Sequence, residues 1–252
     1  MSGQAILYDL SHKGPEPNTC WSPNVWKTRL ILNYKKIPYT SQFIDHPNIA
    51  STLSSLNITP NPSPPPGSSP APKPSPYTLP AIKLPNGTSL QDSAAIAPKL
   101  EETCPEPSLH LETGLHEQVG KLIGGIAMPM LKVIYPAIAR NIIKEEYLDS
   151  WLAGKEPKLG MSMQEFEASG GESAWKAAEP GFVALKEFLA SNKKDKGPFI
   201  LGSQVCYGDF IIAALLESVR IIGDGLFERF VGYDEQLREL HEACGEWFVD
   251  NK

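Results

Sequence analysis

The chain has 252 residues, of which 41% are hydrophobic, so it is long enough to bury one large core or two smaller ones. Its formal net charge of −6 argues against a nucleic-acid partner, because phosphate backbones are bound by basic surfaces. The four cysteines are widely spaced without a CxxC pair, and the five histidines show no metal-ligand spacing. We therefore expect a globular protein with reduced thiols and no metal site.

The N-terminal sequence gives no sign of export. No basic residue precedes the apolar run 5–8, which is too short for the apolar core of a signal peptide. The longest apolar region, residues 122–139, contains Lys132 and two prolines. It is expected to form a buried, bent helix and no membrane span. The expected location is the cytoplasm.

Strand and helix patterns alternate at the start of the chain. Residues 5–10 and 39–44 have the pattern of short strands, and residues 24–36 between them have helical periodicity. A strand–helix–strand order predicts a parallel strand pair joined by a right-handed crossover. An α/β unit is therefore expected to begin the chain.

Proline dominates residues 59–80, which hold ten of the 24 prolines. Because proline lacks an N–H and fixes φ, this run can form neither a helix nor a central strand. We expect an exposed insert within the first domain, with polyproline II or disordered character. Docking of a proline-recognising partner at residues 62–65 is the alternative.

A hairpin and a helix follow the insert. Residues 81–84 and 88–90 flank Pro85-Asn86-Gly87, and Asn-Gly favours a tight turn between antiparallel strands. Residues 94–102 have a helical pattern that begins after Asp92-Ser93, two residue types that cap helix starts.

The rest of the chain is predicted to be all-helical, because strand signals stop near residues 103–112. Candidate helices run through residues 112–140, 162–191, 209–222 and 234–248. We therefore expect two domains, an α/β domain over residues 1–104 and an all-helical domain over residues 110–252.

The most informative motif is Ser22-Pro23, where the first strand gives way to the first helix. A helix begins with unpaired N–H groups and the positive end of its dipole, so it attracts an anion. Pro23 suits the first helical position, and Ser22 is a favoured N-cap residue whose hydroxyl can point at a ligand. The motif predicts either a site that stabilises an anion such as a thiolate or an ordinary helix cap.

This order of elements resembles the cytosolic glutathione transferase family across nearly the whole chain. Ser22-Pro23 stands where the serine and cysteine types of that family carry their thiol-facing residue. Thr78-Leu79-Pro80 resembles its cis-proline turn, and Asp92-Ser93 resembles its acidic-Ser helix start. The sequence of residues 21–29 is most similar to the fungal branch of the family that is related to bacterial β-etherases. Those enzymes use glutathione to cleave lignin-derived aryl ethers.

The helical half carries a further match. Residues 197–202 and Tyr207-Gly208-Asp209-Phe210 look like the family's buried loop and the capping box before its core helix. The family usually has Ser or Thr three residues before the Asp, and Cys206, a poor capping acceptor, takes that place here. We expect Asp209 to accept hydrogen bonds from amides of its own loop while Cys206 packs as a small apolar residue.

The resemblance implies a thioredoxin-like first domain that binds glutathione and a helical domain that lines a hydrophobic substrate site, in a homodimer. The hydroxyl of Ser22 would stabilise the glutathione thiolate for attack on electrophilic or aromatic compounds. Leu79, if Pro80 is cis, would pair its backbone with the cysteinyl part of glutathione. Asp92 and Ser93 would bind the γ-glutamyl end, with helix capping as the alternative.

Aromatic and flexible apolar side chains are expected at the acceptor site, with core packing as the alternative. These are Trp21, Trp26, Met128, Met130 and Tyr135. Two other functions stay open. One is a noncatalytic protein that binds glutathione and plant phenolics, and the other is a thiol transferase with Cys20 as nucleophile, although Cys20 lies two residues before the motif. Lys27 and Arg29 are expected on a solvated face, as a tether between the domains, with contact to the glycyl carboxylate of glutathione as the alternative.

Overall fold

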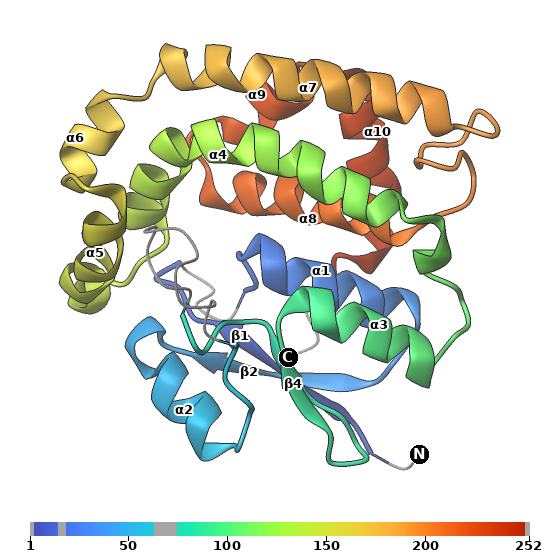
Figure 1. Ribbon diagram of the computed structural model, residues 1–252, viewed down its shortest axis with the longest axis horizontal. Coiled ribbons are helices and arrows are strands. Elements are labelled where there is room, and N and C mark those ends of the chain that lie inside the picture. The colour runs from blue at the N-terminus through green and yellow to red at the C-terminus, as the bar shows by residue number, and fades with distance from the viewer. Residues whose placement is uncertain (1–2, 15–18, 63–74, 250–252) are drawn as a thin grey trace.

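The computed structural model describes residues 3–14, 19–62 and 75–249 (Figure 1). Its first half holds a four-stranded mixed sheet of order β2-β1-β3-β4. The strands are β1 (Ala5–Leu10), β2 (Tyr39–Ile44), β3 (Ala81–Lys83) and β4 (Ser89–Gln91). The pair β1–β2 is parallel, as predicted, and the other two pairs are antiparallel. Gly87 turns the hairpin with a φ of 87°, which only glycine adopts at little cost.

Helices connect these strands and join the sheet to the second half. They are α1 (Pro23–Tyr34), η1 (His46–Asn48), α2 (Ile49–Ser55) and α3 (Ser93–Thr103). In Figure 1, α1 and α3 lie between the sheet and the helices of the second half, and α1 packs on both α3 and α8. The described ends of the proline-rich insert, residues 59–62 and 75–80, hold neither helix nor strand, as expected, and residues 63–74 lie outside the described part.

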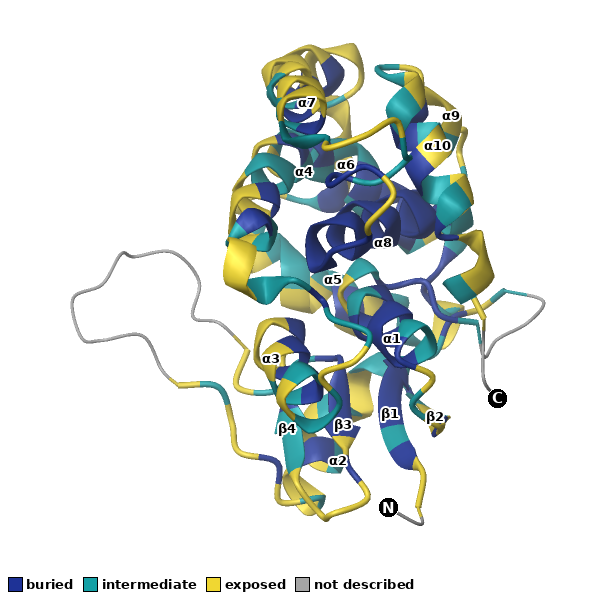
Figure 2. Cartoon of the chain, turned by 90° about the vertical axis from the view of Figure 1, so that its right-hand side faces the viewer, coloured by how far each residue is buried: buried dark blue, intermediate teal, exposed yellow. Residues whose placement is uncertain are grey.

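The second half is helical, as predicted. Its elements are η2 (Leu111–Thr113), α4 (Leu115–Asn141), α5 (Glu145–Leu159), α6 (Met163–Ala168), α7 (Glu172–Asn192), α8 (Tyr207–Ile222), α9 (Leu226–Val231), α10 (Glu235–Ala243) and η3 (Gly245–Trp247). Helix α8 is buried along most of its length and forms the centre of this half (Figure 2). The architecture is a thioredoxin-like domain followed by a helical domain. The predicted domain bounds, 1–104 and 110–252, stay a prediction.

One helix prediction needs correction, and three α-helices were not predicted. The single helix expected over residues 162–191 is two helices, α6 and α7, because Gly171 takes a φ of 59° between them and breaks the helical path. The separate helices α2, α5 and α9 were not predicted. Among the described helices, α4 alone has the length and apolar composition of a membrane-crossing helix. It packs along α7 and α8, but only 33% of its most apolar stretch is buried, so the helix expected to be buried is partly exposed. The cytoplasmic location stays a prediction.

Arg29 lies in the core of the first domain, so its expected place on a solvated face was wrong. Both Arg29 and Asp9 are 0% exposed, and Nη2 of Arg29 lies 2.7 Å from Oδ2 of Asp9 on β1. The second guanidinium nitrogen, Nη1, donates to the hydroxyl of Tyr39 at 3.3 Å. Lys27, two residues earlier on α1, instead donates to Asn24 at 2.9 Å. Because residues two apart face different sides of a helix, only Arg29 meets the sheet.

A buried lysine holds the connection between the domains. The side chain of Lys35, just after α1, is 0% exposed and forms an ion pair of 2.6 Å with Glu101 on α3. Its Nζ also donates to the carbonyl oxygens of Cys104 and Pro107, each at 2.7 Å. The end of α1 therefore fixes the end of α3 and the start of the linker together.

Asp209 caps the loop before α8, as expected. Its Oδ1 accepts from the N–H of Ile200 and its Oδ2 from the N–H of Cys206, both at 2.7 Å. Burial raises the pKa of the Asp209 carboxyl to about 6. Cys206 is buried among apolar side chains, and this burial also raises the pKa of its thiol.

Candidate functional site

Ser22 forms the N-cap of α1, at the point where the chain leaves the loop after β1. Its backbone is extended, with φ −76° and ψ 127°, and its carbonyl accepts from the N–H of Trp26 at 2.9 Å. The side chain makes no capping hydrogen bond, although an N-cap serine usually uses its hydroxyl in this way. With Pro23 at the first helical position, the hydroxyl stays available for a ligand beside the N–H groups of the helix start.

Leu79 offers its backbone to a ligand. The Leu79-Pro80 peptide bond is cis, and the residue is 8% exposed. Within the part of the chain that the structure describes, neither the N–H nor the C=O of Leu79 has a hydrogen-bond partner. A buried backbone without partners is uncommon, so an extended peptide that pairs with Leu79 fits this place.

The side chain of Gln91 stabilises the loop around Leu79. Its Oε1 accepts from the N–H of Thr78 at 2.8 Å. Its Nε2 donates to the carbonyl oxygens of Thr59 at 2.8 Å and Pro76 at 3.0 Å. One buried amide thus joins both ends of the proline-rich insert next to the cis bond.

Asp92 and Ser93 open α3. Asp92 has a φ of 76°, and its Oδ1 accepts from the N–H of Ala94 at 3.0 Å, so it does cap the helix. Asp92 is exposed, whereas Ser93 is buried. The charge of Asp92 raises the pKa of Lys27 on α1, although burial has the larger effect and lowers it. The starts of α1 and α3 are therefore neighbours, which lets two helix N-termini act on one ligand.

A cavity of about 580 Å³ opens at Ser22 between the two domains. Four of the predicted site residues line it, namely Trp21, Ser22, Leu79 and Tyr135. Its other walls are mostly apolar and come from β1, α1, η1, α2, α4, α5 and α8 and from the loop before Leu79. We call this cavity the interdomain cleft. An apolar cavity with a few polar groups at one end is what a small-molecule site requires.

Three predicted acceptor residues do not line the interdomain cleft. Trp26 is buried in the core, where its Nε1 donates to the carbonyl of Cys20 at 3.0 Å and its ring meets Phe248 edge-on. On α4, Met128 is 67% exposed and Met130 is fully buried. The α4 residues on the cleft are Ala127, Leu131, Ile134, Tyr135 and Ile138. They form one helix face, and the two methionines lie at its opposite edges, Met128 towards solvent and Met130 towards the core.

Other predicted residues lie beside the interdomain cleft. Pro80, Asp92 and Ser93 are not among its walls, although Leu79 next to them is. Cys20 is 0% exposed and is likewise absent from the walls. This burial does not favour Cys20 as a nucleophile.

The sequence analysis missed the contribution of α5. Trp151, Lys155 and Lys158 line the interdomain cleft, and the Nζ of Lys155 lies 4.9 Å from the ring centre of Tyr135 and 5.5 Å from that of Trp151. Their spacing of four and three residues places them on one helix face. This spacing was visible in the sequence, but its significance depends on α5 reaching the first domain.

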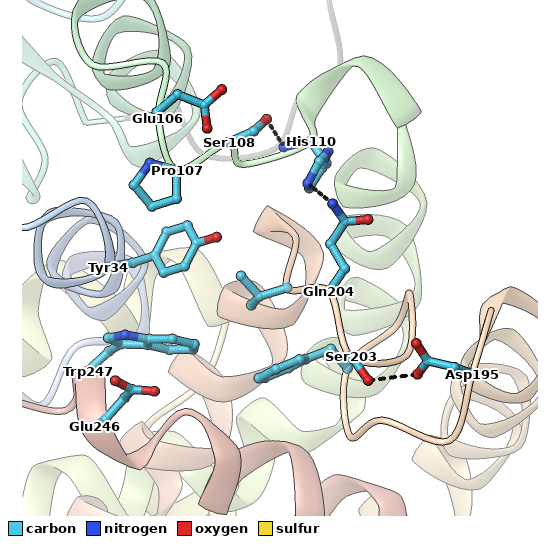
Figure 3. Close-up of a pocket in the computed structure, with 12 residues that line it drawn as sticks. Tyr34, Glu106, Pro107, Ser108, His110, Asp195, Ser203, Gln204, Glu246 and Trp247 are labelled. Atoms are coloured by element: carbon cyan, nitrogen blue, oxygen red, sulfur yellow. Dashed lines mark hydrogen bonds between the residues drawn. The ribbon is translucent and has the colours of Figure 1, made fainter.

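A second cavity, of about 820 Å³, contains none of the predicted site residues (Figure 3). Four of its polar side chains already pair with one another. Nε2 of His110 lies 2.7 Å from Nε2 of Gln204, and the hydroxyl of Ser203 donates to Asp195 at 3.0 Å. We therefore place the candidate site in the interdomain cleft. In the described residues, no group of three or more His, Cys, Asp or Glu side chains is arranged to hold a metal ion.

Two protein-family models match this chain. Residues 21–103 match the glutathione S-transferase N-terminal domain, and residues 116–246 match the glutathione S-transferase C-terminal domain. The chain is 30% identical to the glutathione S-transferase-like protein ustS of Aspergillus flavus, over 96% of this chain and 90% of that protein.

Solved fungal structures share the whole fold. Glutathione transferase GSTFuA3 from Phanerochaete chrysosporium is 25% identical, with a TM-score of 0.84 over 97% of each chain. The glutathione S-transferase CsGST63524 of Ceriporiopsis subvermispora, solved in complex with glutathione, is 26% identical, with a TM-score of 0.84 over 98% of each chain. These likenesses confirm the resemblance drawn from the sequence motifs.

Proposed function

Because the chain belongs to the glutathione S-transferase family, we propose that it transfers glutathione to electrophilic or aromatic compounds, with Ser22 as the residue that activates the thiol. The observation that carries this proposal is the hydroxyl of Ser22, which makes no cap hydrogen bond at the start of α1 and lies on the interdomain cleft. The related CsGST63524 structure holds glutathione, which supports the same co-substrate here.

Glutathione would lie along the first domain, next to the starts of α1 and α3. Its cysteinyl part would pair with the N–H and C=O of Leu79, beside the cis bond to Pro80. Its γ-glutamyl end would reach the start of α3, where Asp92 faces the ammonium group and Ser93 with the helix amides faces the carboxylate. This placement brings the thiol to Ser22.

The surroundings of Ser22 can supply the energy that thiolate formation needs. Lowering a thiol pKa from about 8.5 by two units requires roughly 2.7 kcal/mol of preference for the thiolate. A hydroxyl that donates to a charged acceptor contributes about 1.5–3 kcal/mol. A helix start adds up to about 2 kcal/mol in a partly buried place. The hydroxyl and the helix start together therefore meet the requirement.

The reaction would be a displacement or addition at an electrophilic carbon held in the cleft. With an aryl halide, the thiolate sulfur forms a bond to the ring carbon, and chloride leaves with the electrons of the carbon–chlorine bond. The thiol proton passes to solvent. With a lignin-derived aryl ether, the oxygen leaves with its bonding electrons and takes up a proton from water. Binding of plant phenolics in the same cleft and a homodimeric state belong to this proposal as well.

The test is Ser22→Ala, with bound glutathione titrated by its thiolate absorbance and turnover measured with 1-chloro-2,4-dinitrobenzene. We expect the bound thiol pKa to rise by about one to two units and turnover to fall about tenfold. Because the hydroxyl makes no cap bond, the free energy of unfolding should change by less than about 0.5 kcal/mol.

Cys20→Ala is the matched control for the rival nucleophile and should leave turnover within about twofold of wild type, since Cys20 is absent from the cleft walls. An unchanged thiol pKa and turnover in Ser22→Ala would refute the assignment. Loss of activity in Cys20→Ala alone would favour a thiol transferase. Glutathione binding without turnover on any acceptor would favour a noncatalytic carrier.

A further inference from the structure

The interdomain cleft carries an unbalanced positive charge. Lys155 and Lys158 line it, and no Asp or Glu is among its described walls. The chain as a whole has a net charge of −6, so this composition is opposite to the average of the molecule. A concave surface lined with one sign of charge raises the local concentration of ligands of the other sign.

The arrangement of α5 produces this charge. Its residues on the cleft are Trp151, Gly154, Lys155 and Lys158, which lie on one helix face. The helix also contains acidic residues, but Glu156 turns to the N–H of Met163 at 2.7 Å and is not among the cleft walls. At the end of α5, Lys155 and Lys158 therefore line the cleft, whereas Glu156 lies outside it.

No acidic side chain on the described walls of the cleft neutralises the charge of Lys155 and Lys158. Burial and the neighbouring charge of Lys158 lower the pKa of Lys155. Burial and both lysines lower the pKa of His46 in the same way. The negative end of the α5 dipole and the rings of Tyr135 and Trp151 stabilise the ammonium of Lys155, but neither neutralises it. A ligand anion would remove this repulsion.

We propose that the interdomain cleft selects aromatic acceptors that carry an anionic group, a carboxylate or an ionised phenol, and that Lys155 and Lys158 bind this group. The inference rests on the proposed function, because it names the substrate class of the same site. The aromatic ring would lie along Tyr135 and Trp151, with its acidic group at the end of α5. Its electrophilic carbon would then face Ser22 at the opposite side of the cleft.

A second indication comes from Trp21, which lines the cleft near Ser22. Its indole Nε1 is buried and has no hydrogen-bond partner among the described residues. A buried donor without a partner costs free energy, which a polar ligand atom would recover. An aromatic acceptor with an oxygen substituent could supply that atom near its reacting end.

Glutathione itself brings another carboxylate, on its glycyl residue. The two lysines belong to the helical domain and flank its aromatic wall, whereas Leu79, Asp92 and Ser93, the proposed contacts of the tripeptide, all belong to the first domain. We therefore assign the lysines to the acceptor. The KM for glutathione distinguishes this assignment from one in which the lysines bind the glycyl carboxylate.

The experiment compares two ligands that differ in charge, 4-chloro-3,5-dinitrobenzoate and its methyl ester. Their dissociation constants are measured by quenching of tryptophan fluorescence without glutathione, so that no turnover is needed. In the Lys155→Gln/Lys158→Gln variant, we expect the dissociation constant for the benzoate to rise about tenfold and that for the ester to change less than about twofold. Lys176→Gln, which removes an exposed lysine on α7, should leave both unchanged.

A double variant that weakens both ligands equally, or neither, would overturn the proposal. So would a rise in the KM for glutathione with unchanged binding of the benzoate, which would assign the lysines to the glycyl carboxylate. Selective loss of the benzoate with an unchanged KM for glutathione supports the acceptor assignment. Because binding is measured without chemistry, a protein that binds the benzoate but turns over no acceptor would refute the proposed transferase and leave the anion site standing.

Discussion

Removal of the guanidinium of Arg29 should destabilise the first domain strongly. Arg29 and Asp9 are both 0% exposed and lie 2.7 Å apart. Methionine in place of arginine keeps most of the aliphatic volume but leaves the Asp9 carboxylate buried without its counter-charge. Breaking a buried ion pair in this way costs about 3–5 kcal/mol. For a chain of this length, a loss of that size lowers Tm by roughly 10 °C.

The assay is urea unfolding of Arg29→Met, Asp9→Asn and the double variant, followed by tryptophan fluorescence. The double variant removes both charges, so its cost should fall below the sum of the single costs by at least about 1 kcal/mol. Lys27→Met is the matched control on the same helix, because the only described hydrogen bond of its Nζ is the exposed one to Asn24. A cost below about 1 kcal/mol for Arg29→Met, or additive costs in the double variant, would refute the reasoning.

Two further predictions concern the loops that support the site and the core helix. Gln91→Leu removes three hydrogen bonds beside Leu79 and should raise the KM for glutathione about threefold or more in initial-rate kinetics. The control, Gln42→Leu on the exposed side of β2, should leave this KM unchanged. Equal KM values for the two variants would contradict the prediction. Burial raises the pKa of Asp209 from 3.8 to about 6, so over this range the folded state keeps a proton that the unfolded state releases. The unfolding free energy of wild type relative to Asp209→Asn should therefore decrease as pH rises through this range and level off above it. A difference that does not vary in a pH series of urea unfolding would speak against it.

Local sequence signals predicted the first domain well. The strands Ala5–Leu10 and Tyr39–Ile44 have the predicted bounds, because both are rich in strand-favouring side chains and stand on either side of a helix that Ser22-Pro23 starts. The helical half was harder. The break between α6 and α7 falls at Ser169-Gly170-Gly171, a helix-breaking signal that the single helix predicted over residues 162–191 disregarded. Helix α5 was missed because only Trp151 in it is buried, which leaves a weak amphipathic pattern.

Some residues of the candidate site could be predicted from the sequence and others could not. Ser22 and Leu79 act through helix start and backbone geometry, which short motifs encode, and both line the interdomain cleft. Acceptor residues depend on how α4 is rotated against its neighbours, and the sequence does not fix this rotation. Met128 and Met130 therefore have suitable chemistry but lie just outside the face of α4 that lines the cleft. Lys155 was missed because its role arises only where α5 meets the first domain.

The buried ammonium of Lys35 determines where this fold tolerates extra chain length. An additional residue between Cys104 and Pro107 would shift carbonyl oxygens away from the ammonium and leave a charge in the protein interior. The proline-rich insert is different, because it leaves and re-enters the domain at the amide of Gln91, and its length does not alter that junction. Variation in length among related chains should therefore concentrate in the insert and spare the linker.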